Sequence, residues 1–235
     1  GQDIACIIVE PVAGNMGCVP PEPGFLETLR EVTSEHGALL IFDEVMCGVR
    51  ASAVGAQKRY NIKPDLTCLG KIVGGGMPMA VFGGAAEIMK EVAPSGPIYQ
   101  AGTLSGNPIA VTAGLATLSA LQRNPMVFNT VESITESLCQ GLEQAAKEEG
   151  VDVVVQRVGS MFTVFFTDKP VKNFDDACAC DQEKFKTFFH YNLEHGIYYA
   201  PSQFESNFMS SMHKASDIQH TVEVARKAFK LIANQ

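Results

Sequence analysis

The stretch "ALLIFDEV" (residues 38–45) decides the fold class of this chain. Its first five residues are apolar, which is typical of a strand that is buried on both faces of a sheet. Two acids, Asp43 and Glu44, follow this run directly. We therefore expect Asp43 to lie at the end of the strand, where it is partly shielded from water.

Strand-like and helix-like runs alternate on both sides of this stretch. Strands are predicted at 4–10, 65–70 and 79–84, and helices at 23–37 and 51–62. The run at 4–10, "IACIIVE", is also almost continuously apolar, so we expect a second strand that is buried on both faces. This order predicts an α/β fold with a mostly parallel sheet flanked by helices.

The pattern changes after residue 108. A helix is expected to start at Pro108, a residue favoured in the first turn of a helix. The elements expected beyond it are a helix around 131–142, strands at 151–159 and 161–167 joined by a tight Gly159-Ser160 turn, and helices at 181–195 and 217–233. We predict a large domain over 1–120 and a smaller α+β domain over 121–235.

Composition narrows the classes of function. The 235 residues carry a net charge of −8, which does not favour nucleic acid or an anionic membrane as a partner. The longest apolar runs are far shorter than the roughly 20 residues of a membrane helix. Seven cysteines, an odd number without a second close pair, favour reduced thiols over disulfides or a metal site.

Ionisable residues follow several of the predicted strands. Glu10, Asp43, Glu44 and Lys71 all lie at strand ends, and ligands of parallel sheets gather at the carboxyl ends of strands. Lys71 stands in "LTCLGKIVGGG" (66–76), which is not a phosphate-binding P-loop because the glycines follow the lysine.

Three interpretations of the lysine and the aspartate are open. Lys71 is a surface side chain, or it forms an ion pair with Asp43, or both residues bind a charged ligand. A protonated pyridine ring beside Asp43, with Lys71 joined covalently to the ring's aldehyde, would meet the needs of pyridoxal phosphate (PLP) chemistry.

Five motifs carry a resemblance to a known family. The chain resembles the class III PLP-dependent aminotransferases of fold type I, and among them most of all the glutamate-1-semialdehyde 2,1-aminomutases. The motifs are "VEPVAGN" (9–15), "LLIFDEVMCGVR" (39–50), "PDLTCLGKIVGGGMP" (64–78), "GTLSGNP" (102–108) and "APSQFE" (200–205).

The resemblance implies roles for three residues at the predicted sheet. Lys71 would hold the cofactor covalently and move the proton during catalysis. Asp43 would pair with the nitrogen of the cofactor ring, and Val45 would pack on the face of the ring. We expect the glycines at 74–76 to turn the chain sharply and to let its backbone approach the flat cofactor.

Four more residues match positions of the family. Asn15 matches a position beside the hydroxyl of the ring. Gly102 matches a cofactor-binding position, and Thr103 matches a residue at the cofactor phosphate of the neighbouring subunit, which implies a homodimer. Glu205 matches an acid that pairs with an arginine before substrate arrives. The resemblance suggests no metal.

Structural readings of these residues stay open beside the functional ones. Asp43 is otherwise a helix cap or an ion-pair partner, and Glu205 a solvated loop acid. Thr103, Ser105 and Asn107 would cap the helix that starts at Pro108, or form an anion site at its N-terminus.

The implied reaction converts (S)-4-amino-5-oxopentanoate to 5-aminolevulinate, with PLP and its pyridoxamine form as cofactor. Glutamyl-tRNA reductase is an implied partner, and the compartment would be the plastid stroma or the bacterial cytoplasm. The alternatives are an ω-amino acid:2-oxo acid aminotransferase and a non-catalytic interaction protein of the same fold. Family members begin well before Gly1, so we expect a fragment that is inactive alone. Cys47, Val49 and Ala80 depart from the family pattern and put the fine positioning of the substrate in doubt.

Overall fold

The computed structural model describes residue 1 and residues 3–235, and it divides the chain into two compact units. Unit 1 comprises Gly1–Pro11 and Pro23–Pro125, and unit 2 comprises Val12–Glu22 and Met126–Gln235. The expected domains, 1–120 and 121–235, remain a prediction. Residue 120 lies inside a helix of unit 1.

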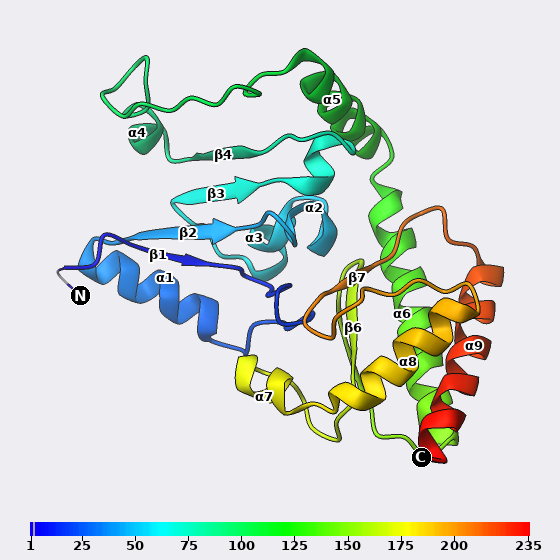
Figure 1. Ribbon diagram of the computed structural model, residues 1–235. Coiled ribbons are helices and arrows are strands. Elements are labelled where there is room, and N and C mark those ends of the chain that lie inside the picture. Colours follow the sequence, from blue (N-terminus) through cyan, green and yellow to red (C-terminus); the bar gives the residue numbers. More distant parts are fainter. Residues whose placement is uncertain (2) are drawn as a thin grey trace. The chain divides into compact units, whose positions relative to one another are not determined.

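Unit 1 is built on a four-stranded mixed sheet with the strand order β1-β2-β3-β4 (Figure 1). The strands β1, β2 and β3 are parallel, and β4 is antiparallel to β3. Their bounds are Cys6–Val9, Leu39–Asp43, Leu66–Leu69 and Val81–Gly84. The mostly parallel sheet that the sequence predicts is confirmed.

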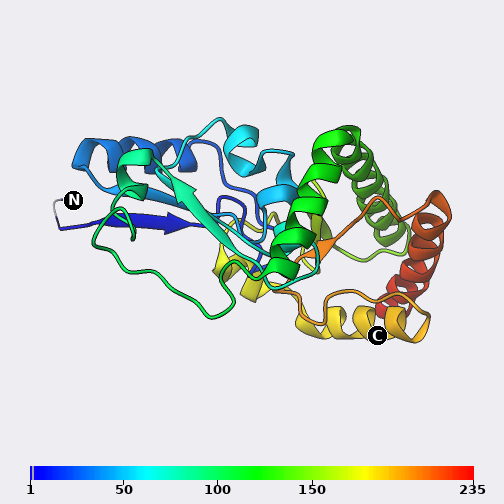
Figure 2. The same ribbon diagram turned by 90° about the horizontal axis from the view of Figure 1, so that it is seen from above.

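The helices of unit 1 follow the predicted order, with α1 along one face of the sheet (Figure 2). Leu26 of α1 packs there against Leu40 and Phe42 of β2. Gly37 adopts a φ of 69° and ends α1, as a C-terminal glycine does. The bounds are α1 Phe25–His36, α2 Gly48–Ala51, α3 Gly55–Tyr60, the 3-10 helix η1 Lys71–Gly74, α4 Ala86–Met89 and α5 Pro108–Arg123.

The expectation that β1 is buried on both faces is wrong for this structure. The side chains of β1 alternate between exposed and partly buried, and Ile8 is 61% exposed. β1 is an edge strand, and α1 covers only the face that carries Ile7 and Val9. An apolar run therefore identified the strand correctly but not its surroundings.

Unit 2 contains a three-stranded antiparallel sheet in the order β5-β6-β7, with a core of long helices. Phe162 and Val164 of β6 belong to the same core as Phe188 and Phe229, whose stacked rings lie 5.1 Å apart. The bounds are α6 Met126–Glu148, β5 Val154–Val158, β6 Met161–Phe165, α7 Phe174–Ala179, α8 Gln182–Glu194, β7 Asn207–Phe208 and α9 Ala215–Ala233.

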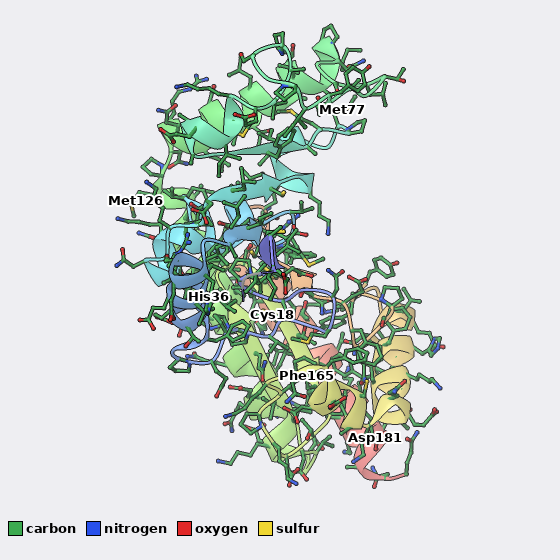
Figure 3. The ribbon with its side chains drawn as sticks, turned by 90° about the vertical axis from the view of Figure 1, so that its left-hand side faces the viewer. Cys18, His36, Met77, Met126, Phe165 and Asp181 are labelled. Carbon is green, nitrogen blue, oxygen red and sulfur yellow. The ribbon has the colours of Figure 1, made fainter. Side chains whose placement is uncertain are left out.

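The other side chains of β6 meet the segment Val12–Glu22, which the sequence assigned to the large domain. Phe165 packs against Val19, and Phe165 and Cys18 are marked in Figure 3. Because a Cβ at Gly17 would lie too close to the ring of Phe165, only glycine allows this approach. All five residues of β6 are therefore buried.

The buried hydroxyl of Thr163 fastens two loops to β6. It accepts a hydrogen bond from the Cys18 backbone N–H at 2.9 Å and donates one to the Glu205 carbonyl at 3.3 Å. A backbone bond from Gly17 to the Phe204 carbonyl, 2.9 Å long, joins the same two loops. One side chain of β6 thus ties together the loops that carry two predicted site residues.

Within the described residues none of the seven cysteines forms a disulfide, and they range from exposed to buried. Burial raises the pKa of the Cys139 thiol to about 12 and that of Cys180 to about 11, whereas Cys6 and Cys178 are exposed. None of the described helices combines the length and the hydropathy that a membrane span requires.

Thiol alkylation at pH 8 should modify Cys6 and Cys178 first. Cys139 and Cys180 should react only after unfolding, because only the thiolate is nucleophilic and their raised pKa values keep them protonated. Mass spectrometry of peptides from the timed reaction measures the order. Alkylation of Cys139 as fast as of Cys6 in the folded protein would contradict the described packing.

Replacing Thr163 by valine should destabilise the protein by about 1–3 kcal/mol, because the Cys18 N–H and the Glu205 carbonyl lose a buried partner. Thr163→Ser keeps the hydroxyl and should cost less. Thr130→Val on the exposed surface of α6 is the control, since its hydroxyl bonds only within its own helix. Denaturant midpoints provide the test, and equal values for Thr163→Val and Thr163→Ser would refute it.

Candidate functional site

Asp43 lies where the sequence places it, at the carboxyl end of β2 and partly buried. The parallel register pairs it with Cys68 of β3. Its Oδ1 accepts a hydrogen bond from the Val45 N–H at 3.0 Å. One further bond continues the ladder beyond the strand, because the Glu44 N–H donates to the Cys68 carbonyl at 2.9 Å. One backbone hydrogen bond thus orients the Asp43 carboxylate, and a second holds the residue that follows it.

Lys71 begins η1, two residues beyond the end of β3, and its side chain is exposed. Its φ is 51°, in the left-handed region that a residue with a Cβ adopts at a cost of about 1–3 kcal/mol. Such strain is concentrated at functional sites. Lys71 lines a hollow of about 540 Å³ together with Arg50 and Pro78. Burial lowers the pKa of the Arg50 guanidinium, and nearby Cys47 opposes this shift.

The glycines after Lys71 form the predicted sharp turn, with a φ of 60° at Gly75. In this structure Gly75 lies close to helix α5, and the approach of a cofactor to these glycines stays a prediction. A Cβ at Gly75 would lie 2.6 Å from the Ala113 carbonyl oxygen, and one at Gly114 would lie 2.6 Å from the Val73 carbonyl oxygen. Glycines on both partners therefore seat the η1 turn directly on α5.

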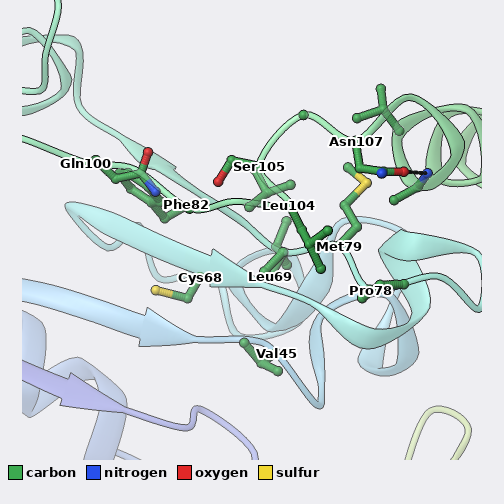
Figure 4. A pocket seen from close by; sticks show the side chains of 16 residues that line it. Val45, Cys68, Leu69, Pro78, Met79, Phe82, Gln100, Leu104, Ser105 and Asn107 are labelled. Atoms are coloured by element: carbon green, nitrogen blue, oxygen red, sulfur yellow. Dashed lines mark hydrogen bonds between the residues drawn. The ribbon is translucent and has the colours of Figure 1, made fainter.

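Val45 forms part of a cavity of about 630 Å³ beside β3 (Figure 4). A Cβ at Gly70 would lie 3.1 Å from Cγ1 of Val45, so Gly70 lets Val45 sit against the backbone just before Lys71. Gly102 lines the same cavity, so the structure brings these two predicted residues together. The other walls come from β3, β4, the start of α5 and the loop before it.

In the loop before α5, the residue that caps the helix is not the residue predicted to bind the cofactor. Asn107 caps the helix, because its side chain accepts hydrogen bonds from the N–H groups of Ile109 and Ala110. Thr103 is exposed and lies in a turn closed by a bond from the Ser105 N–H to the Gly102 carbonyl, 2.9 Å long. The capping role that the sequence left open thus falls to Asn107, and the cofactor role of Thr103 stays a prediction.

Glu44 does not join the cluster of ionisable groups that we expected at the strand ends. It is 1% exposed, and its carboxylate accepts hydrogen bonds from the Ala56 N–H and the Gln57 side chain. Cys68, which the sequence did not single out, lies beside Asp43 instead. Burial raises the pKa of the Cys68 thiol, and the charge of Asp43 adds to this shift.

Asn15 and Glu205 belong to unit 2, and both are exposed. The Thr163 hydroxyl hydrogen-bonds to both of their loops. Ser206 donates a further hydrogen bond to the Gly14 carbonyl at 3.3 Å. Asp43, Val45, Lys71, Gly102 and Thr103 all belong to unit 1. The structure thus gathers the predicted residues into one set in each unit.

The groups present in unit 1 fit PLP. In the described part of the chain, no ion pair joins Asp43 and Lys71, so the ion-pair interpretation of these residues is not supported. Asp43 keeps acceptor positions free for a protonated ring nitrogen, and the exposed Lys71 amine has no hydrogen-bond partner among the described residues. Over those residues, no cluster of His, Cys, Asp or Glu could hold a metal ion.

Comparison with solved structures supports this reading. The chain is similar to an omega-transaminase from Sphaerobacter thermophilus (29% identity, TM-score 0.89) over 98% of its own length and 52% of that chain. It is also similar to a beta-phenylalanine aminotransferase from Variovorax paradoxus (32%, TM-score 0.86), covering 96% of this chain and 52% of that one. A glutamate-1-semialdehyde-aminomutase from Pseudomonas aeruginosa PAO1 in complex with PMP gives 26% and 0.85, covering 97% and 52%.

The chain thus spans about half the length of these relatives. The family model for class-III aminotransferases matches residues 1–222, which is nearly the whole chain. Together with the sheet, the strand-end aspartate and the lysine turn, this match shows that the chain belongs to the class-III aminotransferase family, whose cofactor is PLP.

Proposed function

We propose that this chain forms part of a PLP-dependent enzyme that moves an amino group within (S)-4-amino-5-oxopentanoate and releases 5-aminolevulinate. The observation that carries the proposal is the strand-end pair. Asp43 is fixed at the end of β2, and Lys71 leaves the neighbouring strand in a strained left-handed turn. An acid for the ring nitrogen and an amine for the aldehyde are the two groups that PLP chemistry requires.

When bound, PLP supplies an electron sink for the negative charge that develops on the substrate carbon. The Asp43 carboxylate would hold a proton at the ring nitrogen, because an opposite charge favours the ionised form. The Lys71 Nζ would bind the cofactor covalently and then carry a proton to and from the substrate carbon. Val45 would orient the ring from the wall of the cavity.

Features outside the strand-end pair extend the proposal. Asn15 and Glu205, which share one set of loops in unit 2, would act on the substrate side. The segment around Thr103 exposes Ile98, Tyr99 and Leu104, which suits an interface with a second subunit whose cofactor Thr103 would reach. Glutamyl-tRNA reductase as a partner, and the plastid stroma or bacterial cytoplasm as the compartment, stay parts of the proposal. We expect the chain to need the remaining half of the family's length for turnover.

A second candidate is an ω-amino acid:2-oxo acid aminotransferase. The sequence identities favour it, since the two transaminases named above match at 29% and 32% and the aminomutase at 26%. Asn15 favours the aminomutase, because many of the aminotransferases resembling this chain carry an acid at that position.

Borohydride reduction of the PLP-loaded protein should attach the pyridoxyl group to Lys71, where peptide mass spectrometry locates it. Lys71→Ala should lose this label and, when the remaining half of the family's length is supplied, lower turnover by at least about 100-fold, because both the covalent link and the proton carrier are gone. Lys58→Ala, at an exposed lysine on α3 of the same unit, should keep the label. A label on another lysine in the unaltered protein would overturn the assignment.

The two candidate functions differ in their need for a second substrate. We expect the enzyme to form 5-aminolevulinate from (S)-4-amino-5-oxopentanoate without added 2-oxo acid. Chromatography of the products with and without pyruvate measures this directly. Product formation that requires the 2-oxo acid would instead support the aminotransferase.

A further inference from the structure

Glu44 stands between the predicted site residues Asp43 and Val45, and its acidic side chain is buried. It is 1% exposed and is among the largest fully buried side chains of the structure. Within the described residues it takes part in no salt bridge. Burying a carboxylate without a cation is costly, so its hydrogen bonds must offset that cost.

The Glu44 carboxylate joins three elements of unit 1. Oε2 accepts a hydrogen bond from the Ala56 N–H at the start of α3, 2.6 Å away. Oε1 accepts one from Gln57 Nε2 at 3.1 Å, and the same nitrogen donates to Thr67 Oγ1 of β3 at 2.9 Å. A Cβ at Gly55 would clash with the carboxylate, so the backbone of α3 closes tightly around it.

The backbone of Glu44 belongs to the turn that presents Asp43 and Val45. Its N–H donates to the Cys68 carbonyl, and its own carbonyl accepts from the Gly48 N–H, both at 2.9 Å. The Val45 N–H in turn donates to Asp43 Oδ1. Asp43 and Val45 are therefore attached on either side of a residue whose main chain and side chain are both anchored.

We propose that Glu44 is a positioning residue, whose buried carboxylate holds the turn between β2 and α2 so that Asp43 and Val45 meet the cofactor in a fixed geometry. The inference rests on the proposed PLP site. Without the carboxylate, the Ala56 N–H and Gln57 lose their acceptor, and α3 no longer ties the turn to β3. The Asp43 carboxylate then gains freedom relative to the strand end.

Three variants separate positioning from general stability. Glu44→Leu keeps a similar volume and removes both acceptors. Glu44→Gln keeps an oxygen for the Ala56 N–H and is the conservative rescue. Leu26→Ala is the matched control, because Leu26 is 1% exposed in the core between α1 and the sheet and its side chain takes part in none of the hydrogen bonds of the turn. Denaturant midpoints of all three show how much each variant destabilises the fold.

The first readout is the binding of PLP to the purified chain. Glu44→Leu should bind PLP at least about tenfold more weakly and shift the pH profile of the bound cofactor's visible absorbance, because Asp43 is no longer held against the ring nitrogen. Tenfold corresponds to about 1.4 kcal/mol. Glu44→Gln should restore most of the affinity, and Leu26→Ala should leave affinity and pH profile unchanged.

The second readout needs no cofactor. Amide hydrogen exchange at Val45 and Gly48 should speed up at least about tenfold in Glu44→Leu, but not in Leu26→Ala at an equal loss of stability. Unchanged exchange at these amides would overturn the inference, as would affinity that follows stability alone in all three variants. Failure of the unaltered chain to take up PLP would count against the proposed function, and the exchange result would still decide the role of Glu44.

Discussion

The parallel pairing of β2 with β3 is the constraint on which the site in unit 1 depends. It sets Asp43 opposite Cys68, and the bond from the Glu44 N–H to the Cys68 carbonyl extends the pairing one residue past the strand. Both strands then end at the same edge of the sheet. β2 continues into the turn that contains Asp43 and Glu44, and β3 continues through Gly70 into Lys71. A slip of one residue would turn Asp43 toward the opposite face, because side chains alternate along a strand.

In unit 2, a side chain rather than strand pairing positions the predicted site residues. Asn15 and Glu205 lie far apart in the sequence, on loops outside the named strands. The hydroxyl of Thr163, projecting from a strand with both faces covered, holds these loops through one accepted and one donated hydrogen bond. Loops that carry functional groups are commonly held by a rigid scaffold in this way.

Much of the fold could be predicted from the sequence because its signals are local. The apolar run before Asp43, the helix-ending Gly37, the Gly159-Ser160 turn and Pro108 each specify a structure within a few residues. The position of Asp43 at a strand end follows from the same kind of signal. The roles assigned to the site residues came from the resemblance to a family, and they stand as predictions.

What the sequence did not reveal depends on contacts between distant segments. The exposure of Ile8 depends on which elements cover an edge strand. The burial of Glu44 depends on the packing of α3 against it, where the Ala56 N–H donates to its carboxylate. Nothing local to Thr163 or Cys68 signals their neighbours, which are separated from them by 145 and 25 positions. The glycines after Lys71 form the expected turn, but the contact of Gly75 with α5, a helix that begins more than thirty residues later, could not be read from the local sequence.

That glycine contact limits how this protein can be engineered. Exchanging a glycine inside a helix for alanine ordinarily adds about 0.8–1.0 kcal/mol of stability, which makes Gly114 of α5 an obvious target for thermostabilisation. Here the added methyl group would press on the Val73 carbonyl oxygen within the turn that starts at Lys71. A gain in helix propensity would therefore displace the turn that carries Lys71, so thermostable variants should be sought on the solvent side of α5.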